Sequence, residues 1–414
     1  MPTGSVPEVV VVRTITDDEV PAYTAAVSRG FNKLPRADDV AFYRPRIDPG
    51  RTYGVFDGDA IVGTARSFPT PLTVPGPCEL TVAAVSNVTV QATHRRRGIL
   101  TEMMRRQLDE VAGRGEPAAI LIASEAPIYG RFGYGAASEN LRLEIDTRQL
   151  RFTSAPPTGR VRYVEPAELR SIGPEVYERF RGAQVGAIAR DGAWWDATTG
   201  IAPRPGADPP AFIAVFEEPD GAHTGFVHYA ITPQWEARRP ASTVMVRDLV
   251  AVTDAAYGAL WRLVASVDLT VHVTAVDRPA REPLRSLIED RRHVQEAERN
   301  DFLWARLLDV PAVLSSRRYR VDDRIVIEVV DEFRPASGGR FALDAGPSGA
   351  ACAPTSEPAD LTLTQSDLGG CVLGAMPLWP AAAAGRVSEH RAGAVAAFDR
   401  LFGEERPAWC HTWF

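Results

Sequence analysis

Along the first third of the chain, apolar and polar positions alternate in the order expected of a mixed sheet with helices. β-Branched or alternating runs predict strands, and apolar residues recurring every three or four positions predict helices. The turn Asp57-Gly58-Asp59 between two of these strands indicates a hairpin, and Thr16 with Glu19 forms a capping box before the first helix. The predicted order is strand 9–13, helix 17–29, strands 52–56, 61–67 and 85–90, helix 99–111 and strand 118–123.

The clearest local signal lies where the strand at 85–90 gives way to the helix at 99–111. The polar break ends in Arg95-Arg96-Arg97, and Gly98 stands where the helix begins. A helix start offers unpaired N–H groups and partial positive charge, and glycine lets a phosphate approach the backbone. Arginines there oppose the helix dipole unless an anion is bound, so the segment predicts an anion site; a solvated arginine run is the alternative. Neither G-x-x-x-x-G-K-[S/T] nor G-x-G-x-x-G follows a strand, so nucleoside triphosphate and dinucleotide sites are poorly supported.

A second cluster follows the apolar strand 118–123. Ser124 and Glu125 end that strand, and a segment with three glycines and two tyrosines, 127–135, comes next. The glycines predict a loop with unusual backbone angles. Its aromatic residues are either packing residues or site residues, and a phenol such as Tyr129 can donate a proton to a leaving thiolate.

Beyond residue 150 the pattern changes twice. The segment 155–159, A-P-P-T-G, predicts a linker, and 203–210 predicts a mobile loop by composition. The intervening part repeats the order of the first third, but its polar break at Thr253-Asp254 carries acid, which would repel a pyrophosphate. From about Leu307, strands precede helices. The predicted strands are 161–164, 212–216, 225–231, 244–252, 324–330, 339–343 and 360–364, and the predicted helices are 166–181, 255–267, 366–373 and 390–402.

Composition bounds the function. The chain has 414 residues, 45% of them hydrophobic, which suits two or three domains with apolar cores. A net charge of −7 without a basic domain argues against nucleic acid and can steer cationic substrates toward the protein. The four cysteines lack metal-binding or disulfide spacing, so no metal is expected. No signal peptide is recognised, and no apolar stretch reaches the roughly 18 residues of a membrane span, so we expect a cytoplasmic protein without membrane contact.

Three segments resemble those of a known family. They are T-H-R-R-R-G-I-L at 93–100, A-S-E-A-P-I-Y-G-R-F-G-Y-G at 123–135 and L-W-A-R-L-L-D-V-P-A at 303–312. They are similar to segments of the Eis (enhanced intracellular survival) family of N-acetyltransferases in the GNAT superfamily. The turn Arg95-x-x-Gly98-x-Leu100 departs from the general GNAT pattern in its last position, where leucine is expected within this family.

The resemblance implies an α+β fold with mixed sheets, in which tandem GNAT-like domains precede a sterol-carrier-protein-like domain. The implied boundaries are 1–154 for the catalytic domain, 155–304 for a degenerate second domain without its own cofactor, and 305–414 for the last domain. The last domain would deliver the C-terminus to the first domain's site; sterol binding is the rival interpretation. A homohexamer is also implied.

The resemblance also assigns roles to residues. Acetyl-CoA is the implied acetyl donor. Tyr129 would be the general acid, and the α-carboxylate of Phe414 the general base. The implied donor-binding residues are Val88 and Val90 for the pantetheine arm, Arg95, Arg96, Gly98 and Ile99 for the pyrophosphate, and Ser124 for the acyl group.

Base catalysis has a physical reason in this chemistry. An alkyl ammonium has a pKa of about 10.4, so neutralising it at pH 7 costs roughly 4–5 kcal/mol, and acid–base assistance is worth about 10²–10⁴-fold. A terminal carboxylate needs apolar surroundings to become a useful base, which Trp409, Trp413 and Phe414 can supply. His411 is a rival base, and Glu125 acting through water is another.

The acceptor is expected to be a cationic small-molecule amine: an aminoglycoside, a polyamine, a peptide antibiotic or a lysine-like amine. Lys33 and Trp413 stand where acidic residues are expected in family members that act on aminoglycosides, although Asp38, Asp39 and Glu125 are near in sequence. Phe42-Tyr43 either lines the acceptor cleft or packs in the core. The alternatives are a non-catalytic acyl-CoA or lipid-binding protein and a protein-lysine acetyltransferase.

Overall fold

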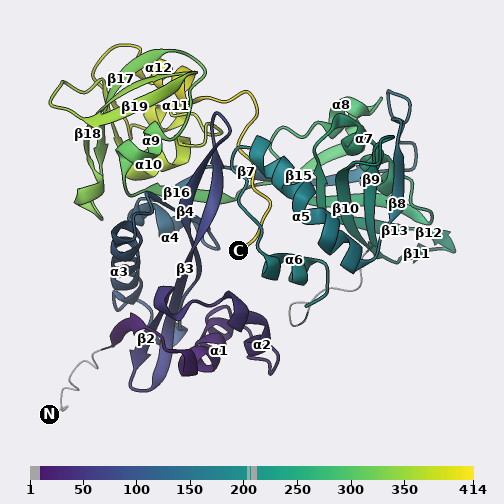
Figure 1. Cartoon of the computed structure of the whole chain (residues 1–414), viewed down its shortest axis with the longest axis horizontal. Coiled ribbons are helices and arrows are strands. Elements are labelled where there is room, and N and C mark those ends of the chain that lie inside the picture. Colours follow the sequence, from purple (N-terminus) through teal and green to yellow (C-terminus); the bar gives the residue numbers. More distant parts are fainter. Residues whose placement is uncertain (1–9, 203–205, 207–211) are drawn as a thin grey trace.

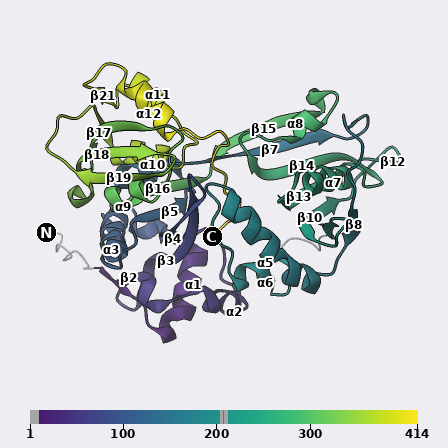
Figure 2. The same ribbon diagram turned by 45° about the horizontal axis from the view of Figure 1, so that its top comes forward.

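Two large mixed sheets and a smaller third sheet organise the chain. The computed structural model describes residues 10–202, 206 and 212–414, and the predicted α+β class with mixed sheets is confirmed. Figures 1 and 2 show that the first and third sheets lie together on one side, that the second forms a separate lobe, and that the C-terminus lies between the lobes. Within the described residues, no helix is both long and apolar enough to cross a bilayer.

The first sheet has the strand order β1-β2-β3-β4-β5-β16-β6. Its first four strands pair antiparallel, and β4 and β5 pair parallel around the crossover helix α3. The apolar stripe of α3 packs on the sheet through Met103, Met104 and Leu108, which are fully buried. The elements of this region are β1 (Val11–Thr14), α1 (Val20–Gly30), α2 (Asp39–Tyr43), β2 (Thr52–Asp57), β3 (Ala60–Val74), β4 (Cys78–Val90), α3 (Ile99–Gly113), β5 (Ala118–Ile122), α4 (Ala126–Tyr129) and β6 (Gly135–Ala136).

The predicted start of the first helix is refined by one turn. Residues 17–19 form a short 3₁₀ turn, and α1 begins at Val20 with Pro21 in its first turn. The capping box is confirmed, since the backbone N–H of Thr16 donates to Glu19 Oε2 at 2.9 Å.

The second sheet has the order β15-β7-β14-β13-β10-β9-β8 and carries α5 and α7. The predicted strands and helices here are confirmed with small shifts, while β7, β14 and β15 were not predicted. The predicted mobile loop 203–210, apart from Gly206, lies outside the described residues, as does Val9. The elements are β7 (Glu139–Asp146), β8 (Arg160–Tyr163), α5 (Pro166–Ala183), α6 (Gly192–Thr198), β9 (Phe212–Glu217), β10 (His223–Thr232), β11 (Trp235–Glu236), β12 (Arg239–Pro240), β13 (Ser242–Ala251), α7 (Asp254–Ala265), β14 (Thr270–Pro279), α8 (Leu284–Leu287) and β15 (Val294–Asp301).

The third sheet has the order β19-β18-β17-β20-β21, with α9 to α12 around it. One hydrophobic core runs from the first sheet into the third and includes Leu72, Ile120, Leu307 and Ile327. The helix α10 lies close against β16, where a Cβ added at Gly369 would be 2.2 Å from the carbonyl oxygen of Ala305. The elements are β16 (Leu303–Leu307), α9 (Val310–Ser315), β17 (Asp323–Val330), β18 (Gly339–Gly346), β19 (Gly349–Pro354), β20 (Leu361–Thr364), α10 (Gln365–Cys371), α11 (Trp379–Ala383), β21 (Ser388–Glu389) and α12 (Ala394–Phe402).

Two strands cross between the sheets. The strand β7 comes before the predicted linker 155–159, yet it lies inside the second sheet between β15 and β14. The strand β16 comes after the second sheet, yet it lies in the first sheet between β5 and β6. The first and second sheets are therefore interleaved along the sequence.

Candidate active site

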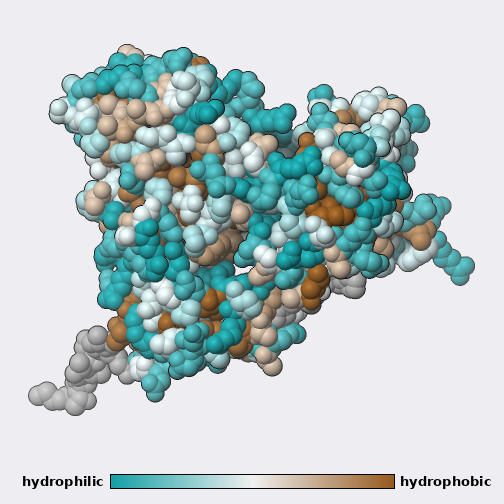
Figure 3. Space-filling view, in the orientation of Figure 1, coloured by the Kyte–Doolittle hydropathy of each residue, from teal (hydrophilic) through white to brown (hydrophobic). Residues whose placement is uncertain are grey.

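A large cavity lies where the three parts of the chain meet. It has a volume of about 1220 Å³, and its walls come from α1 and α2, from the middle strands of the first sheet, from residues 188–198 and from the C-terminus. The surface is recessed between the lobes, near the place where Figure 1 shows the C-terminus (Figure 3). Four of the predicted site residues line this cavity: Val88, Ser124, Tyr129 and Phe414.

The strands β4 and β5 separate at the cavity. They pair only at Ala83 with Ala119 and at Ala84 with Ile120. Beyond these pairs the cavity is lined by residues 85–88 of β4 and by residues 121–124, which form the end of β5 and the two positions after it. A bulge against β3 accompanies the separation, and Asn87 adopts a φ of +55° there. An extended ligand with amide groups can therefore pair with the β5-facing edge of β4.

The predicted anion turn follows the same strand. Gly98 is the N-cap of α3 with a φ of +77°, which confirms it as the helix start, and a Cβ added there would meet nothing within 4 Å. Arg95 and Arg96 are exposed, and neither forms an ion pair in the described part of the chain. Four unpaired helix N–H groups, an open backbone and free guanidinium groups fit a pyrophosphate. The residues of this turn lie outside the cavity lining, as does Val90: Arg95, Arg96, Gly98 and Ile99.

Tyr129 lies at the end of the short helix α4, so the predicted loop is wrong at this position. Of its three glycines, only Gly133 has a positive φ, +82°. The ring of Tyr129 is buried edge-to-face against Tyr134, with ring centroids 6.1 Å apart. Burial, with a smaller contribution from the Glu125 carboxylate, raises the pKa of Tyr129 to about 12, so the phenol keeps its proton at neutral pH.

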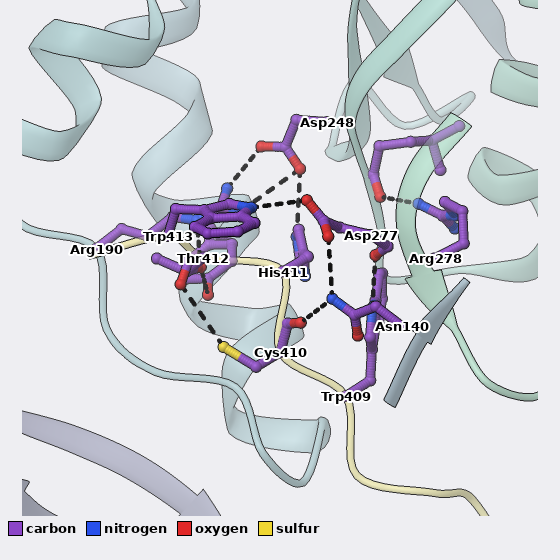
Figure 4. Close-up of polar contacts among 12 residues, drawn as sticks. Asn140, Arg190, Asp248, Asp277, Arg278, Trp409, Cys410, His411, Thr412 and Trp413 are labelled. Carbon is purple, nitrogen blue, oxygen red and sulfur yellow. Dashed lines mark hydrogen bonds and ion pairs between the residues drawn. The ribbon is translucent and has the colours of Figure 1, made fainter. Parts of the chain in front are cut away.

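Residues 409–413 are held by the second lobe (Figure 4). Trp409 Nε1 donates to the carbonyl oxygen of Asp277 at 2.8 Å, and Trp413 Nε1 donates to the Asp277 carboxylate at 2.8 Å. Asn140 donates to the carbonyl oxygen of Cys410 at 2.8 Å. The tail therefore docks as an extended segment with both side-chain and backbone partners.

A buried charged cluster holds the centre of the tail. Arg190 pairs with Asp248 at 2.7 Å and donates through Nε to Thr412 Oγ1 at 3.0 Å. His411 Nε2 lies 3.2 Å from Asp248 Oδ1, and its ring stacks on Trp409 at 4.3 Å. The Arg190 guanidinium and the nearby His411 ring hold the pKa of Asp248 below its usual range. These contacts fix the direction in which the chain enters the cavity.

The tail ends in the cavity. The ring of Phe414 meets Phe68 edge-to-face at 5.9 Å, and the carbonyl oxygen of Trp413 accepts from Trp194 Nε1 at 3.3 Å. The rival base His411 is buried away from the cavity lining, and burial followed by the Arg190 charge lowers its pKa to about 4. The other rival, Glu125, is exposed and also lies outside the lining.

The cavity lining carries more basic than acidic side chains. It contains Lys33, which is the only lysine in the sequence, and the arginines Arg46, Arg66 and Arg190. The acidic side chains in the lining are Asp48 and Asp191. Both cap backbone N–H groups, of Gly50 at 2.9 Å and of Trp194 at 2.6 Å.

Several acceptor-side expectations are now resolved. Phe42 and Tyr43 line the cavity, while Asp38 and Asp39 do not. The buried Asp39 carboxylate accepts a hydrogen bond from Ser28 Oγ at 3.1 Å. Sequence reasoning missed Arg66 and Arg190; the signal for Arg66 was a charged residue at an inward position of an otherwise apolar strand. All four cysteines are free, and no metal-binding group of His, Cys, Asp or Glu occurs among the described residues.

Comparisons with known proteins agree with this geometry. The N-acetyltransferase Eis of Mycobacterium tuberculosis is 32% identical over 95% of this chain and 96% of its own length. The chain belongs to the Eis family. An uncharacterized N-acetyltransferase of Streptomyces avermitilis is 39% identical over 96% of this chain and 98% of its own length. The crystal structure of Eis1 from Mycobacterium abscessus superposes with a TM-score of 0.84 at 33% identity, covering 98% of this chain and all of that one.

Family models divide this Eis-family chain into three parts. Acetyltransferase (GNAT) domain models match residues 11–137 and 186–311, and a sterol carrier protein domain model matches residues 310–411. The predicted tandem GNAT domains followed by a sterol-carrier-like domain are thereby confirmed. The protein is an acetyl-CoA-dependent N-acetyltransferase, and acetyl-CoA is the donor that GNAT domains bind.

Proposed function

We propose that this Eis-family enzyme acetylates the primary amine of a small molecule bound in the cavity, with Tyr129 as general acid and the Phe414 carboxylate as general base. The supporting observation is that these two residues, far apart in the sequence, line one cavity together with Val88 and Ser124.

The donor is proposed to lie along the opened edge of β4. Val88 and Val90 pair their backbone with the pantetheine arm, and Ser124 lines the acyl end. The turn residues Arg95, Arg96, Gly98 and Ile99 hold the pyrophosphate at the start of α3. The early end of β4–β5 pairing and the free space beside Gly98 support this placement.

The chemical step needs a proton removed and a proton supplied. The amine nitrogen attacks the thioester carbonyl, the C–S bond breaks, and an amide C–N bond forms. The Phe414 carboxylate takes the proton that the amine loses, and Tyr129 gives its proton to the departing thiolate. Burial raises the pKa of Tyr129, and it raises the pKa of a thiol in the same way. The pKa values of the phenol that gives the proton and of the thiolate that takes it therefore change in the same direction.

The acceptor is proposed from the cationic amines expected from the sequence, with a restriction set by charge. Lys33 and three arginines line the cavity together with two aspartates and Phe414. Coulomb repulsion therefore disfavours polycations such as aminoglycosides and polyamines relative to lysine-like amines with one reactive nitrogen. Family membership sets aside the non-catalytic alternative. A protein-lysine acceptor stays an alternative, tested by competition between small amines and peptides.

The assembly and location stay predictions. The homohexamer is checked by sedimentation of the purified protein, and the cytoplasm by fractionation of cells. The absence of nucleic-acid and membrane partners is checked by electrophoretic mobility and vesicle-binding assays.

The test measures CoA release in four proteins: the wild type, Tyr129→Phe, Tyr134→Phe, and a chain extended by one glycine after Phe414. We expect Tyr129→Phe and the extension each to lower kcat about 10²-fold or more with little change in the KM for acetyl-CoA. Tyr134→Phe, which removes a neighbouring buried hydroxyl, is the matched control and keeps kcat within about 3-fold of the wild type. Unchanged turnover after the extension contradicts the role of the terminal carboxylate.

A further inference from the structure

Arg66 is a buried cation that forms no ion pair with any carboxylate of the described residues. It lies in β3 opposite Ser86 of β4, it is 8% exposed, and its Nε has no hydrogen-bond partner in the described part of the chain. Its guanidinium donates from Nη1 to the carbonyl oxygen of Arg46 at 2.8 Å. The other buried arginines of the described residues each have a carboxylate within 4.0 Å: Arg51, Arg190, Arg278, Arg306 and Arg317.

An unpaired guanidinium in this position is costly. Arginine stays protonated in proteins, and burying a charge without a partner costs several kcal/mol. The ring of Phe68, whose centroid is 5.0 Å from the guanidinium carbon, offsets part of that cost. A bound anion would offset more, because a guanidinium and a carboxylate can form two parallel charge-assisted hydrogen bonds.

The surroundings of Arg66 indicate where such an anion would lie. Arg66 lines the same cavity as Tyr129 and Phe414, and Phe68 touches both the Arg66 guanidinium and the Phe414 ring. The aspartates of the lining cap backbone N–H groups, and neither forms an ion pair with Arg66; Asp191 stabilises the Arg66 charge only from a longer distance. The remaining walls are rich in aromatic side chains: Phe31, Phe42, Tyr43, Trp194 and Trp413.

We propose that the acceptor is an amine that also bears a carboxylate on an aromatic body, of the chemical class of aromatic amino acids. The carboxylate pairs with Arg66, the aromatic body packs on the cavity walls, and the amine faces the acetyl-transfer residues. This inference rests on the proposed function and narrows its acceptor. The negative charge of such an acceptor complements the basic cavity lining, whereas a polycationic amine would be repelled by it.

The experiment compares acceptors that differ only in the carboxylate. CoA release is measured with L-tryptophan, its carboxamide and tryptamine, and with the corresponding phenylalanine set. The proteins are the wild type, Arg66→Gln, Arg66→Lys, and the control Arg44→Gln, which removes an exposed arginine of the 3₁₀ turn 44–46 that Arg66 contacts. Binding of L-tryptophan and tryptamine to each protein is measured in parallel by calorimetry.

We expect the wild type to use and bind the carboxylate-bearing member of each set about 10-fold better or more, as a buried charge-assisted contact implies. Arg66→Gln abolishes that preference and keeps tryptamine turnover within about 3-fold, Arg66→Lys restores part of the preference, and Arg44→Gln leaves it unchanged.

Three results overturn the proposal. One is a wild type that binds L-tryptophan no better than tryptamine. Another is a preference that survives in Arg66→Gln. The third is an equal loss of turnover for all acceptors in Arg66→Gln, which would make Arg66 a partner of the Phe414 carboxylate. A carboxylate preference in binding without any turnover would instead support this site and contradict the proposed general acid and base.

Discussion

Each of the two GNAT domains has a groove of the same design between two parallel strands, and the two grooves hold different things. In each, a parallel strand pair is joined by a helix, β4–α3–β5 in the first and β13–α7–β14 in the second. The strand pairs end early in both, after Ala84 with Ile120 and after Val246 with Ala275. Both leading strands also carry a bulge against the preceding strand. The fold therefore supplies two openings of similar design.

The second opening is filled by the chain itself. Asp248 and Asp277 lie just beyond the last pair on their two strands, and the tail contacts both, through His411 and through Trp409 and Trp413 (Figure 4). The first opening leads instead into the cavity that receives the end of this tail.

The helix starts show what separates a ligand groove from a docking groove. The α3 start has Gly98 and exposed arginines, and its N–H groups have no side-chain cap. At the α7 start, Thr253 Oγ1 accepts from the N–H of Ala256 at 3.1 Å and donates to Glu218 at 2.9 Å. Asp254 adds a negative charge in the first turn. A few residues at one turn thus decide whether an anion is attracted or excluded.

The comparison is tested most strongly by removing Asp248 from the filled groove. Asp248→Ala leaves Arg190 buried without its carboxylate, and we expect a loss of about 3–5 kcal/mol in the free energy of unfolding together with lower kcat. Denaturant unfolding and CoA release measure the two effects. Asp268→Ala, which removes an exposed aspartate of the same lobe, is the control and changes stability by about 0.5 kcal/mol or less. A loss below about 1 kcal/mol for Asp248→Ala contradicts a tail held by this cluster.

Acidification is expected to weaken the same groove. The folded protein protonates His411 at about pH 4, and the unfolded chain does so near pH 6.5, so the unfolded state binds more protons in this window. The contribution of His411 to the free energy of unfolding is complete above about pH 6.5. It falls by about 3 kcal/mol as the pH drops toward 4. His228, also buried with its pKa lowered to about 4, adds to the effect.

Unfolding measured between pH 4 and 6.5 checks this dependence. His411→Gln reduces the slope of stability against pH by about one proton. An unaltered slope in His411→Gln shows that His411 is not buried in its neutral form.

Backbone strain at the helix start of the first groove is expected to have a smaller effect, limited to the binding of acetyl-CoA. Gly98→Val places a branched residue at a φ of +77°, at a cost of about 1–2 kcal/mol, and we expect the KM for acetyl-CoA to rise about 10-fold. Gly221→Val introduces similar strain at a φ of +88° in the second lobe and is expected to leave that KM unchanged. Calorimetry is expected to give one acetyl-CoA per wild-type chain; two would contradict the difference between the grooves.

Removing the N-cap of α7, at the second groove, is expected to have the smallest effect. Thr253→Ala removes the cap of α7 and lowers the free energy of unfolding by about 1 kcal/mol without changing the KM for acetyl-CoA. Thr101→Ala, in the first turn of α3 and without a capping role, is the control. A new acetyl-CoA site in Thr253→Ala would show that the cap alone had closed the second groove.

The local parts of the site could be predicted from the sequence because they depend on short-range patterns. The glycine at the α3 start needs only a strand, a polar break and a helix in succession, and the structure has Gly98 there with a left-handed backbone. Val88, Ser124, Tyr129 and Phe414 were implied by the family resemblance, and all line one cavity.

The remaining features depend on partners distant in sequence. Nothing in 139–146 indicates which sheet β7 joins, because its alternating pattern suits either. The edge strand β15 reads V-Q-E-A-E-R-N-D and is largely exposed, so it lacks the apolar signal of a strand. Arg66 is unusual only once the neighbours of its guanidinium are known, and the docking of the tail on Asp248 and Asp277 is equally invisible before folding.

The position of β16 has a consequence for synthesis on the ribosome. This strand separates β5 from β6, so a nascent chain that has emerged only as far as the linker still lacks the strand that joins β6 to the rest of its first sheet. That sheet can be completed only after about 300 residues have left the exit tunnel, when the second lobe is already available. Until then the exposed edge of β5 is a target for chaperones, and a gene fragment cut at the linker encodes a sheet without its closing strand.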